Sequence, residues 1–168
     1  MNMTDKKQIY LGGPLFSEAD QLFNAQLAAQ IRERFGDRIE LYSPQENDAI
    51  NDKSGYANSI DIFEGDNEYL DKTDILIANL DGPVVDPGLG AEIGYFYHSG
   101  KPILGLYSDS RQGHFNNQDK IDALEEIAES QFSYINLYVV GAVKKRGKIY
   151  KSSADLLKAL GELLDEKE

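Results

Sequence analysis

The 168-residue sequence predicts an α/β fold of the flavodoxin/Rossmann-like class: one domain with a doubly wound parallel sheet of five strands, flavodoxin-like in order. Short apolar runs alternate with segments of helical periodicity, which is typical of parallel strands joined by right-handed crossovers. The central run DILIANL (Asp74–Leu80) is almost continuously apolar, as expected for a strand buried on both faces. The chain length favours a single domain over residues 1–168.

The first predicted elements are a strand, a helix and a second strand. QIYLGG (Gln8–Gly13) is a strand that ends in glycines. Apolar residues then recur at helical spacing over Ser17–Phe35, with Ser17 as the N-cap and Gly36 after the last turn. IELYSP (Ile39–Pro44) follows as the second strand.

Between the second strand and Asp74–Leu80 we expect a loop and a helix. The polar residues 47–58 predict the loop, and Ser59–Lys72 predicts the helix. The apolar face of this helix is expected to consist of Ile62, Phe63, Tyr69 and Leu70.

The second half of the chain continues the alternation. We expect a helix from about Gly88 to Ser99, a strand over Pro102–Tyr107 and a helix over residues 119–130. INLYVVGAV (Ile135–Val143) predicts the fifth strand, and Ser152 to about Leu164 predicts the last helix. The basic stretch VKKRGK that follows Ile135–Val143 is then a solvated hairpin or loop.

Composition excludes several classes of protein. The net charge of −12 argues against a nucleic-acid binder or a protein of anionic membrane surfaces. The absence of cysteine excludes disulfides and thiolate chemistry. The N-terminus lacks the apolar core of a signal peptide, and no run approaches a transmembrane helix, so we expect a cytoplasmic protein.

Motifs for common cofactors are also missing from the sequence. GGP after the first strand is not a dinucleotide fingerprint, and no phosphate-binding P-loop motif occurs. His98 and His114 have no metal-ligand spacing between them. We therefore expect neither a metal nor an organic cofactor.

In an open α/β sheet, ligands bind in the crevice outside the carboxyl ends of the strands. This rule predicts that the binding site is built from Gly12–Phe16, Ser43–Asp48, Leu80–Glu92 and Tyr107–Arg111.

Glu92 is the most notable carboxylate of this predicted crevice. It lies in the first turns of a helix rich in glycine and alanine, where the helix dipole favours an anion and small residues allow close approach. Such a carboxylate suits nucleophilic attack or stabilisation of a cationic centre. It could equally be a glutamate that only stabilises the helix end, just as Asp86 could be an N-cap and Asp66 a solvent-facing residue.

Four stretches of the sequence resemble the nucleoside 2-deoxyribosyltransferase family over nearly the whole chain. They are IYLGGPLF at the first strand, DNEYLDKTDILIANLDG in the middle, DPGLGAEIGYFYHSGKPILGLYSD after it and INLYVVGAV late in the sequence. The resemblance implies an enzyme that exchanges the base of a 2′-deoxynucleoside for a free nucleobase without a cofactor.

The same resemblance implies roles for single residues. Glu92 matches the nucleophile that attacks C1′ of the sugar, and Tyr10 matches the tyrosine that orients it. Asp66 and Asp86 match aspartates that bind the substrate and exchange protons with the base. Asn136 matches an asparagine lent by a neighbouring subunit, so we expect a homo-oligomer, a dimer or larger, and place Asn136 on an edge strand away from its own crevice.

The remaining substrate contacts are expected from residues of the crevice: Gly12, Gly13, Phe16, Gly88, Asn47 and Asp48, with Glu46 as a further candidate on the base side. Two alternatives stay open. One is a hydrolase of the same superfamily that cleaves 2′-deoxynucleoside 5′-monophosphates, and the other is a noncatalytic nucleotide-binding module.

Overall fold

The computed structural model describes residues 6–48 and 56–165. Its centre is a five-stranded, all-parallel sheet of order β2-β1-β3-β4-β5. The strands are β1 (Lys7–Gly12), β2 (Ile39–Tyr42), β3 (Ile75–Asn79), β4 (Ile103–Leu106) and β5 (Gly147–Tyr150). This topology confirms the predicted fold class and strand order.

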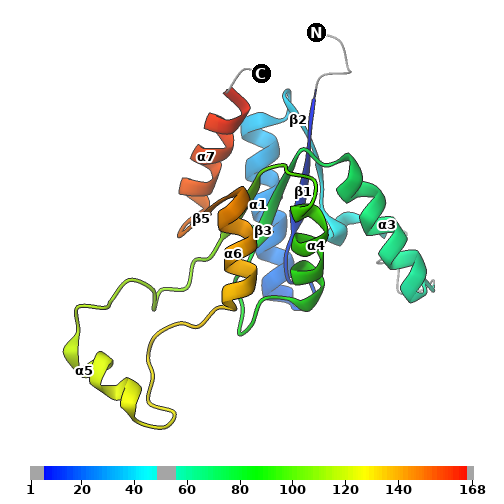
Figure 1. Ribbon diagram of the computed structural model, residues 1–168. Helices are drawn as coiled ribbons and strands as arrows, with labels where there is room; N and C mark the ends of the chain where they lie inside the picture. Colours follow the sequence, from blue (N-terminus) through cyan, green and yellow to red (C-terminus); the bar gives the residue numbers. More distant parts are fainter. Residues whose placement is uncertain (1–5, 49–55, 166–168) are drawn as a thin grey trace.

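Helices cover both faces of the sheet (Figure 1). Helices α1 (Glu18–Phe35) and α7 (Ser153–Asp165) share one apolar cluster with the sheet. On the other face lie α3 (Ser59–Lys72), α4 (Pro87–Tyr97) and α6 (Leu137–Arg146). Every residue of β3 is buried, because this central strand is covered on both faces, as predicted for Asp74–Leu80.

Helix ends agree with the predicted capping residues. Ser17 caps α1 in a reciprocal capping box with Asp20, and Gly36 follows its last turn. The backbone N–H of Asp155 donates to Oγ of Ser152, so Ser152 caps the start of α7. Short 3₁₀ turns, η1 (Pro44–Glu46) and η2 (Ala123–Glu125), follow β2 and α5 (Gln118–Asp122).

The prediction of a strand over Ile135–Val143 is wrong, because these residues begin helix α6. A short run rich in β-branched residues does not by itself distinguish a strand from a packed helix. Asn136 caps the helix and three basic residues lie in its last turn, both of which are helix signals. The fifth strand is Gly147–Tyr150, which overlaps the stretch predicted as a hairpin or loop.

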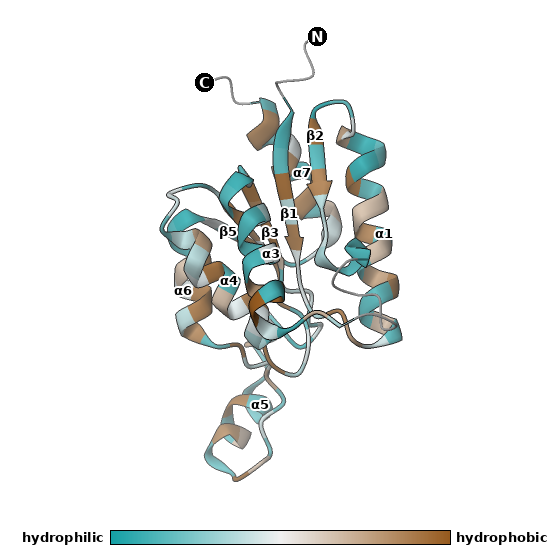
Figure 2. Cartoon of the chain, turned by 90° about the vertical axis from the view of Figure 1, so that its right-hand side faces the viewer, coloured by the Kyte–Doolittle hydropathy of each residue, from teal (hydrophilic) through white to brown (hydrophobic). Residues whose placement is uncertain are grey.

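The helix predicted over residues 119–130 is shorter, consisting of α5 and η2 alone. Both stand away from the sheet on an arm that we define as residues 108–135 (Figures 1 and 2). Ile127 is 98% exposed on this arm, so this apolar side chain contributes no burial that would stabilise a longer helix.

Helix α3 has the predicted bounds, but only one residue of its predicted apolar face is buried. Leu70 is buried, whereas Ile62, Phe63 and Tyr69 are exposed. The loop predicted over residues 47–58 falls largely on residues 49–55, which lie outside the described residues. Within the described part of the chain, no helix is both long and apolar enough to cross a membrane.

Candidate active site

A cavity of about 440 Å³ opens at the carboxyl ends of the central strands. Three of the four predicted crevice segments contribute to its wall, together with α3. The lining residues are Gly13, Leu15, Phe16, Pro44, Ile62, Asp66, Asp86, Pro87, Gly88, Leu89 and Glu92. Three carboxylates, one from α3, one from the N-cap of α4 and one from α4 itself, therefore face one mostly apolar space. This convergence was not visible from their spacing in the sequence.

Glu92, which lines the cavity, is hydrogen-bonded to Tyr10. The hydroxyl of Tyr10, a fully buried residue of β1, donates to Oε1 of Glu92 at 2.8 Å. Glu92 lies on α4, so the bond joins β1 to one of the helices that cover the sheet. The tyrosine thereby holds one carboxylate oxygen in place.

Burial raises the pKa of the Glu92 carboxyl from 4.5 to about 7. The hydrogen bond from Tyr10 opposes this rise, and the charges of Asp66 and Asp86 add to it. A carboxyl whose pKa lies near neutrality, within a cavity, is a candidate for a chemical role rather than a helix-stabilising one.

Two glycines at the end of β1 allow this arrangement. A Cβ atom at Gly12 would lie 3.0 Å from Oε2 of Glu92 and 2.8 Å from Cδ1 of Leu89. At Gly13, a Cβ atom would lie 2.8 Å from Cβ of Asn79 on the neighbouring strand. Any larger residue at either position would push the carboxylate or the strand end out of place.

Asp66 reaches the cavity from the middle of α3, although its sequence position is that of a solvent-facing residue. Burial raises the pKa of its carboxyl, and a hydrogen bond from the Tyr42 hydroxyl at 3.3 Å lowers it. The Tyr42 hydroxyl in turn accepts from Nδ2 of Asn47 at 3.1 Å. Sequence reasoning missed Tyr42, whose only signal was its place at the end of the second strand.

Asp86 both caps α4 and faces the cavity. Its Oδ1 accepts from the backbone N–H of Leu89 at 2.9 Å, and Pro87 occupies the first helical position. The N-cap alternative for Asp86 is therefore confirmed. It does not exclude contact with a ligand, because Asp86 and the neighbouring Gly88 both line the cavity.

Asn136 lies at a second, smaller cavity of about 220 Å³ that shares Asp86 and Pro87 with the first. Its side chain caps α6 by accepting from the backbone N–H groups of Tyr138 and Val139. The expectation that Asn136 opens an edge strand far from its own crevice is wrong, because it begins a helix beside the Asp86 loop.

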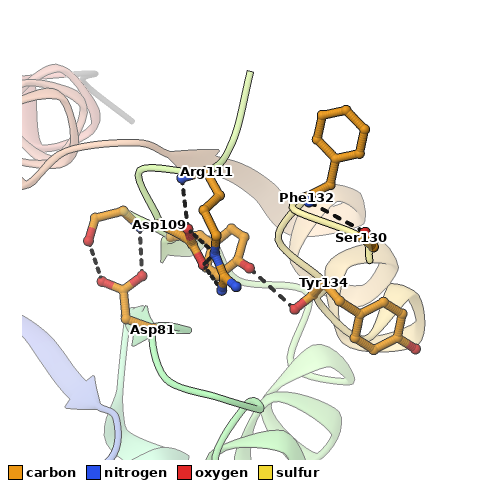
Figure 3. A network of polar contacts seen from close by, with 8 residues as sticks. Asp81, Asp109, Arg111, Ser130, Phe132 and Tyr134 are labelled. Carbon is orange, nitrogen blue, oxygen red and sulfur yellow. Dashed lines mark hydrogen bonds and ion pairs between the residues drawn. The ribbon is translucent and has the colours of Figure 1, made fainter. Parts of the chain in front are cut away.

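The fourth predicted segment does not line the main cavity. At the ends of β3 and β4, Asp81 accepts from the backbone N–H and the hydroxyl of Ser108, both at 2.6 Å. Asp109 pairs with Arg111 alongside (Figure 3). These contacts tie the loop after β3 to the base of the arm, so the segment braces the loop that carries Asp86.

The three residues predicted on the base side have different surroundings, and none of them is among the lining residues of the main cavity. Asn47 contacts Tyr42, Asp48 is exposed and outside the lining, and Glu46 pairs with Arg32. Four apolar residues complete the wall, none of which the sequence analysis named individually as a site residue: Leu15, Pro44, Ile62 and Leu89. Among residues 6–48 and 56–165, no group of three acidic or histidine side chains is placed to hold a metal ion.

Comparison with known proteins gives one family. The family model described as nucleoside 2-deoxyribosyltransferase matches residues 9–125. The crystal structure of a conserved protein from Enterococcus faecalis is 49% identical, with a TM-score of 0.87 over 94% of this chain and 99% of that one.

Two further comparisons extend this result. A 2-deoxyribosyltransferase from Bacillus psychrosaccharolyticus has a TM-score of 0.61 at 22% identity, over 95% of this chain and 97% of that one, which shows the shared fold. A putative 2′-deoxynucleoside 5′-phosphate N-hydrolase from Thermofilum pendens is 29% identical over 59% of this chain and 66% of its own length.

Proposed function

The chain belongs to the nucleoside 2-deoxyribosyltransferase family, and on this premise we propose that it exchanges the base of 2′-deoxynucleosides through a covalent 2-deoxyribosyl ester of Glu92. The observation that carries the proposal is the Glu92 carboxylate, held by the Tyr10 hydroxyl at 2.8 Å and facing a cavity with two further carboxylates.

In the first half of the reaction, an oxygen of Glu92 attacks C1′ of the bound deoxynucleoside. The glycosidic C–N bond breaks, and its electron pair leaves with the base nitrogen. Positive charge develops on the sugar ring in the transition state, and a close carboxylate stabilises it. That charge also favours the ionised form of Glu92, although burial raises its pKa to about 7.

Asp66 is the proposed acid and base for the nucleobase. A departing base leaves more readily when protonated, and burial raises the pKa of the Asp66 carboxyl, which favours the protonated form needed for donation. The incoming base then attacks C1′, displaces Glu92 and returns a proton to Asp66. Asp86, at the boundary of both cavities, is proposed to bind the sugar hydroxyls.

Small residues near Glu92 support a deoxyribose substrate. Gly12 lies directly against the Glu92 carboxylate, Gly13 and Gly88 line the cavity without side chains, and exposed Phe16 offers an apolar surface for the base. Asn47 and Asp48, in the turn after β2, are proposed to contact the base. We propose that residues 1–168 form one catalytic domain that acts in cytoplasmic nucleoside salvage.

A homo-oligomer is proposed from the surface around Asn136. Leu137 and Tyr138 are 75% and 86% exposed, and Tyr134 is 76% exposed on the arm. Contiguous exposed apolar side chains of this kind mark interaction surfaces. In the proposed assembly, Asn136 of one subunit reaches the sugar hydroxyls bound in another.

The hydrolase of 2′-deoxynucleoside 5′-monophosphates remains the second candidate, because of the relative from Thermofilum pendens. The cavity argues against it. Its described lining contains three carboxylates and no lysine, arginine or serine, so a phosphate would meet negative charge without a donor side chain to balance it.

The test is base exchange by the purified protein. Given deoxyinosine and adenine, it should form deoxyadenosine and hypoxanthine without added phosphate or metal, with Glu92→Gln as the inactive control. Free deoxyribose as the sole sugar product at saturating adenine would reject transfer in favour of hydrolysis. No turnover of nucleosides or of monophosphates would instead favour a binding module.

Shared sites are tested by mixing two inactive variants, Glu92→Gln and Asn136→Ala. Hybrid oligomers would contain one site with both residues intact, so activity should partly recover after the subunits exchange. If no activity returns although hybrids form, Asn136 acts within its own chain or not at all.

A further inference from the structure

Tyr42, at the end of β2, places its hydroxyl against the proposed acid–base residue. The hydroxyl donates to Oδ1 of Asp66 at 3.3 Å and accepts from Nδ2 of Asn47 at 3.1 Å. The two hydrogen bonds therefore run in one direction, from the amide through the hydroxyl to the carboxylate. Hydrogen bonds in such a chain polarise and strengthen one another.

Packing on both sides holds the Tyr42 ring. It stacks on Tyr69 of α3, with centroids 3.5 Å apart and planes at 10°, and it lies 5.3 Å from Tyr10 at a tilt of 48°. Tyr10 is fully buried and itself holds Glu92. The position of the Tyr42 hydroxyl is thus set by the same aromatic cluster that positions the nucleophile.

The Tyr42 hydroxyl is in the protonated form that a hydrogen-bond donor to Asp66 requires. Burial, then the charge of Asp66, raises the pKa of the Tyr42 hydroxyl well above its usual range, although the bond from Asn47 opposes this. The hydroxyl therefore keeps its proton at neutral pH and can donate it to Asp66. Burial raises the pKa of Asp66 and the hydrogen bond from Tyr42 lowers it, so the hydroxyl acts against desolvation.

We propose that Tyr42 is a positioning residue for Asp66. Its hydroxyl donates a hydrogen bond to Oδ1 of Asp66, so the proton that is exchanged with the base is carried by Oδ2. The same hydroxyl links the Asp66 carboxyl to Asn47. This inference rests on the proposed function for its catalytic consequence. Its physical core, the coupling between Tyr42 and the titration of Asp66, is independent of the reaction.

The structure offers a matched pair of variants. Tyr42→Phe keeps the ring and removes the hydroxyl. Tyr95→Phe removes a hydroxyl that donates to Asp71 at 2.7 Å, a second tyrosine–aspartate bond to α3 that lies outside the cavity. Both substitutions remove the same kind of bond from the same helix, and only the first acts on Asp66.

The decisive measurement is the titration of the Asp66 carboxyl by NMR in protein with ¹³C-labelled aspartate. The pKa of Asp66 should rise in Tyr42→Phe and stay at the wild-type value in Tyr95→Phe. In exchange assays, kcat should fall about tenfold in Tyr42→Phe with little change in KM, as expected for one lost bond to a carboxylate. Its pH profile should shift in the direction of the Asp66 titration.

A second variant keeps the test independent of the aromatic stack. Asn47→Ala leaves the Tyr42 ring and hydroxyl in place, and should shift the Asp66 titration in the same direction by a smaller amount. An unchanged Asp66 pKa in Tyr42→Phe would overturn the inference. If the wild-type protein exchanges no bases, the proposed function fails, yet the titration still decides whether Tyr42 controls Asp66.

Discussion

Replacement of Glu92 by glutamine should change how the stability of the protein depends on pH. Glutamine has nearly the same size and keeps an oxygen that accepts from the Tyr10 hydroxyl. It removes the charge that burial makes unfavourable. Burial, with the charges of Asp66 and Asp86 and against the Tyr10 bond, raises the pKa of Glu92 from 4.5 to about 7.

The raised pKa sets both the sign and the size of the effect. Between pH 4.5 and about pH 7, the folded protein binds the Glu92 proton more tightly than the unfolded chain does. The stabilisation is fully present below pH 4.5 and is lost as the pH rises through about 7. At about 1.36 kcal/mol per pH unit, this interval corresponds to about 3 kcal/mol.

The assay is urea unfolding of wild type and Glu92→Gln at a series of pH values. From about pH 4 to about pH 8, the variant should gain about 3 kcal/mol of unfolding free energy relative to wild type. Glu46→Gln is the control: Arg32 lowers the pKa of Glu46 from 4.5, so the stabilisation of the ionised form is lost only as the pH falls below 4.5. The difference between this variant and wild type should therefore stay nearly constant from about pH 5 to about pH 8. A difference between Glu92→Gln and wild type that stays flat across this range would refute the argument.

Three other substitutions follow from the same geometry. Tyr10→Phe removes the donor to Glu92, so the pKa of Glu92 should rise and the ascending limb of kcat/KM should move to higher pH; an unmoved limb contradicts this. Gly12→Ala brings a methyl group 2.8 Å from Leu89 and 3.0 Å from Glu92. The turnover of this variant should fall about 100-fold, and its unfolding free energy should fall by about 1–3 kcal/mol. Kinetics close to those of wild type would contradict the tight contact between Gly12 and Glu92. Asp81→Ala removes both hydrogen bonds from Ser108 and should lower the unfolding free energy, measured by urea unfolding, by about 1–2 kcal/mol. An unchanged unfolding free energy would mean that these two hydrogen bonds do not stabilise the fold.

The parts of the fold that could be predicted are those specified by local sequence features, such as apolar runs and helix-capping residues. The apolar run Asp74–Leu80 predicted a buried central strand, and Ser17 and Gly36 predicted the two ends of α1. The rule that ligands bind at the carboxyl ends of parallel strands placed the cavity correctly. Pattern failed at Ile135–Val143, where apolar, β-branched residues fit a strand and a packed helix equally well, and the crossover to β5 required the helix.

The sequence by itself determined the fold class, the strand order and the end of the sheet at which Glu92 lies. Only the tertiary structure decided which side chains meet there. Tyr10 and Glu92 are 82 positions apart, and Tyr42 and Asp66 are 24 apart, so their contacts depend on strand register and on how α3 and α4 pack over the sheet. Periodicity places a residue on a face of an element, but the packing of one element against another sets the distance between two side chains.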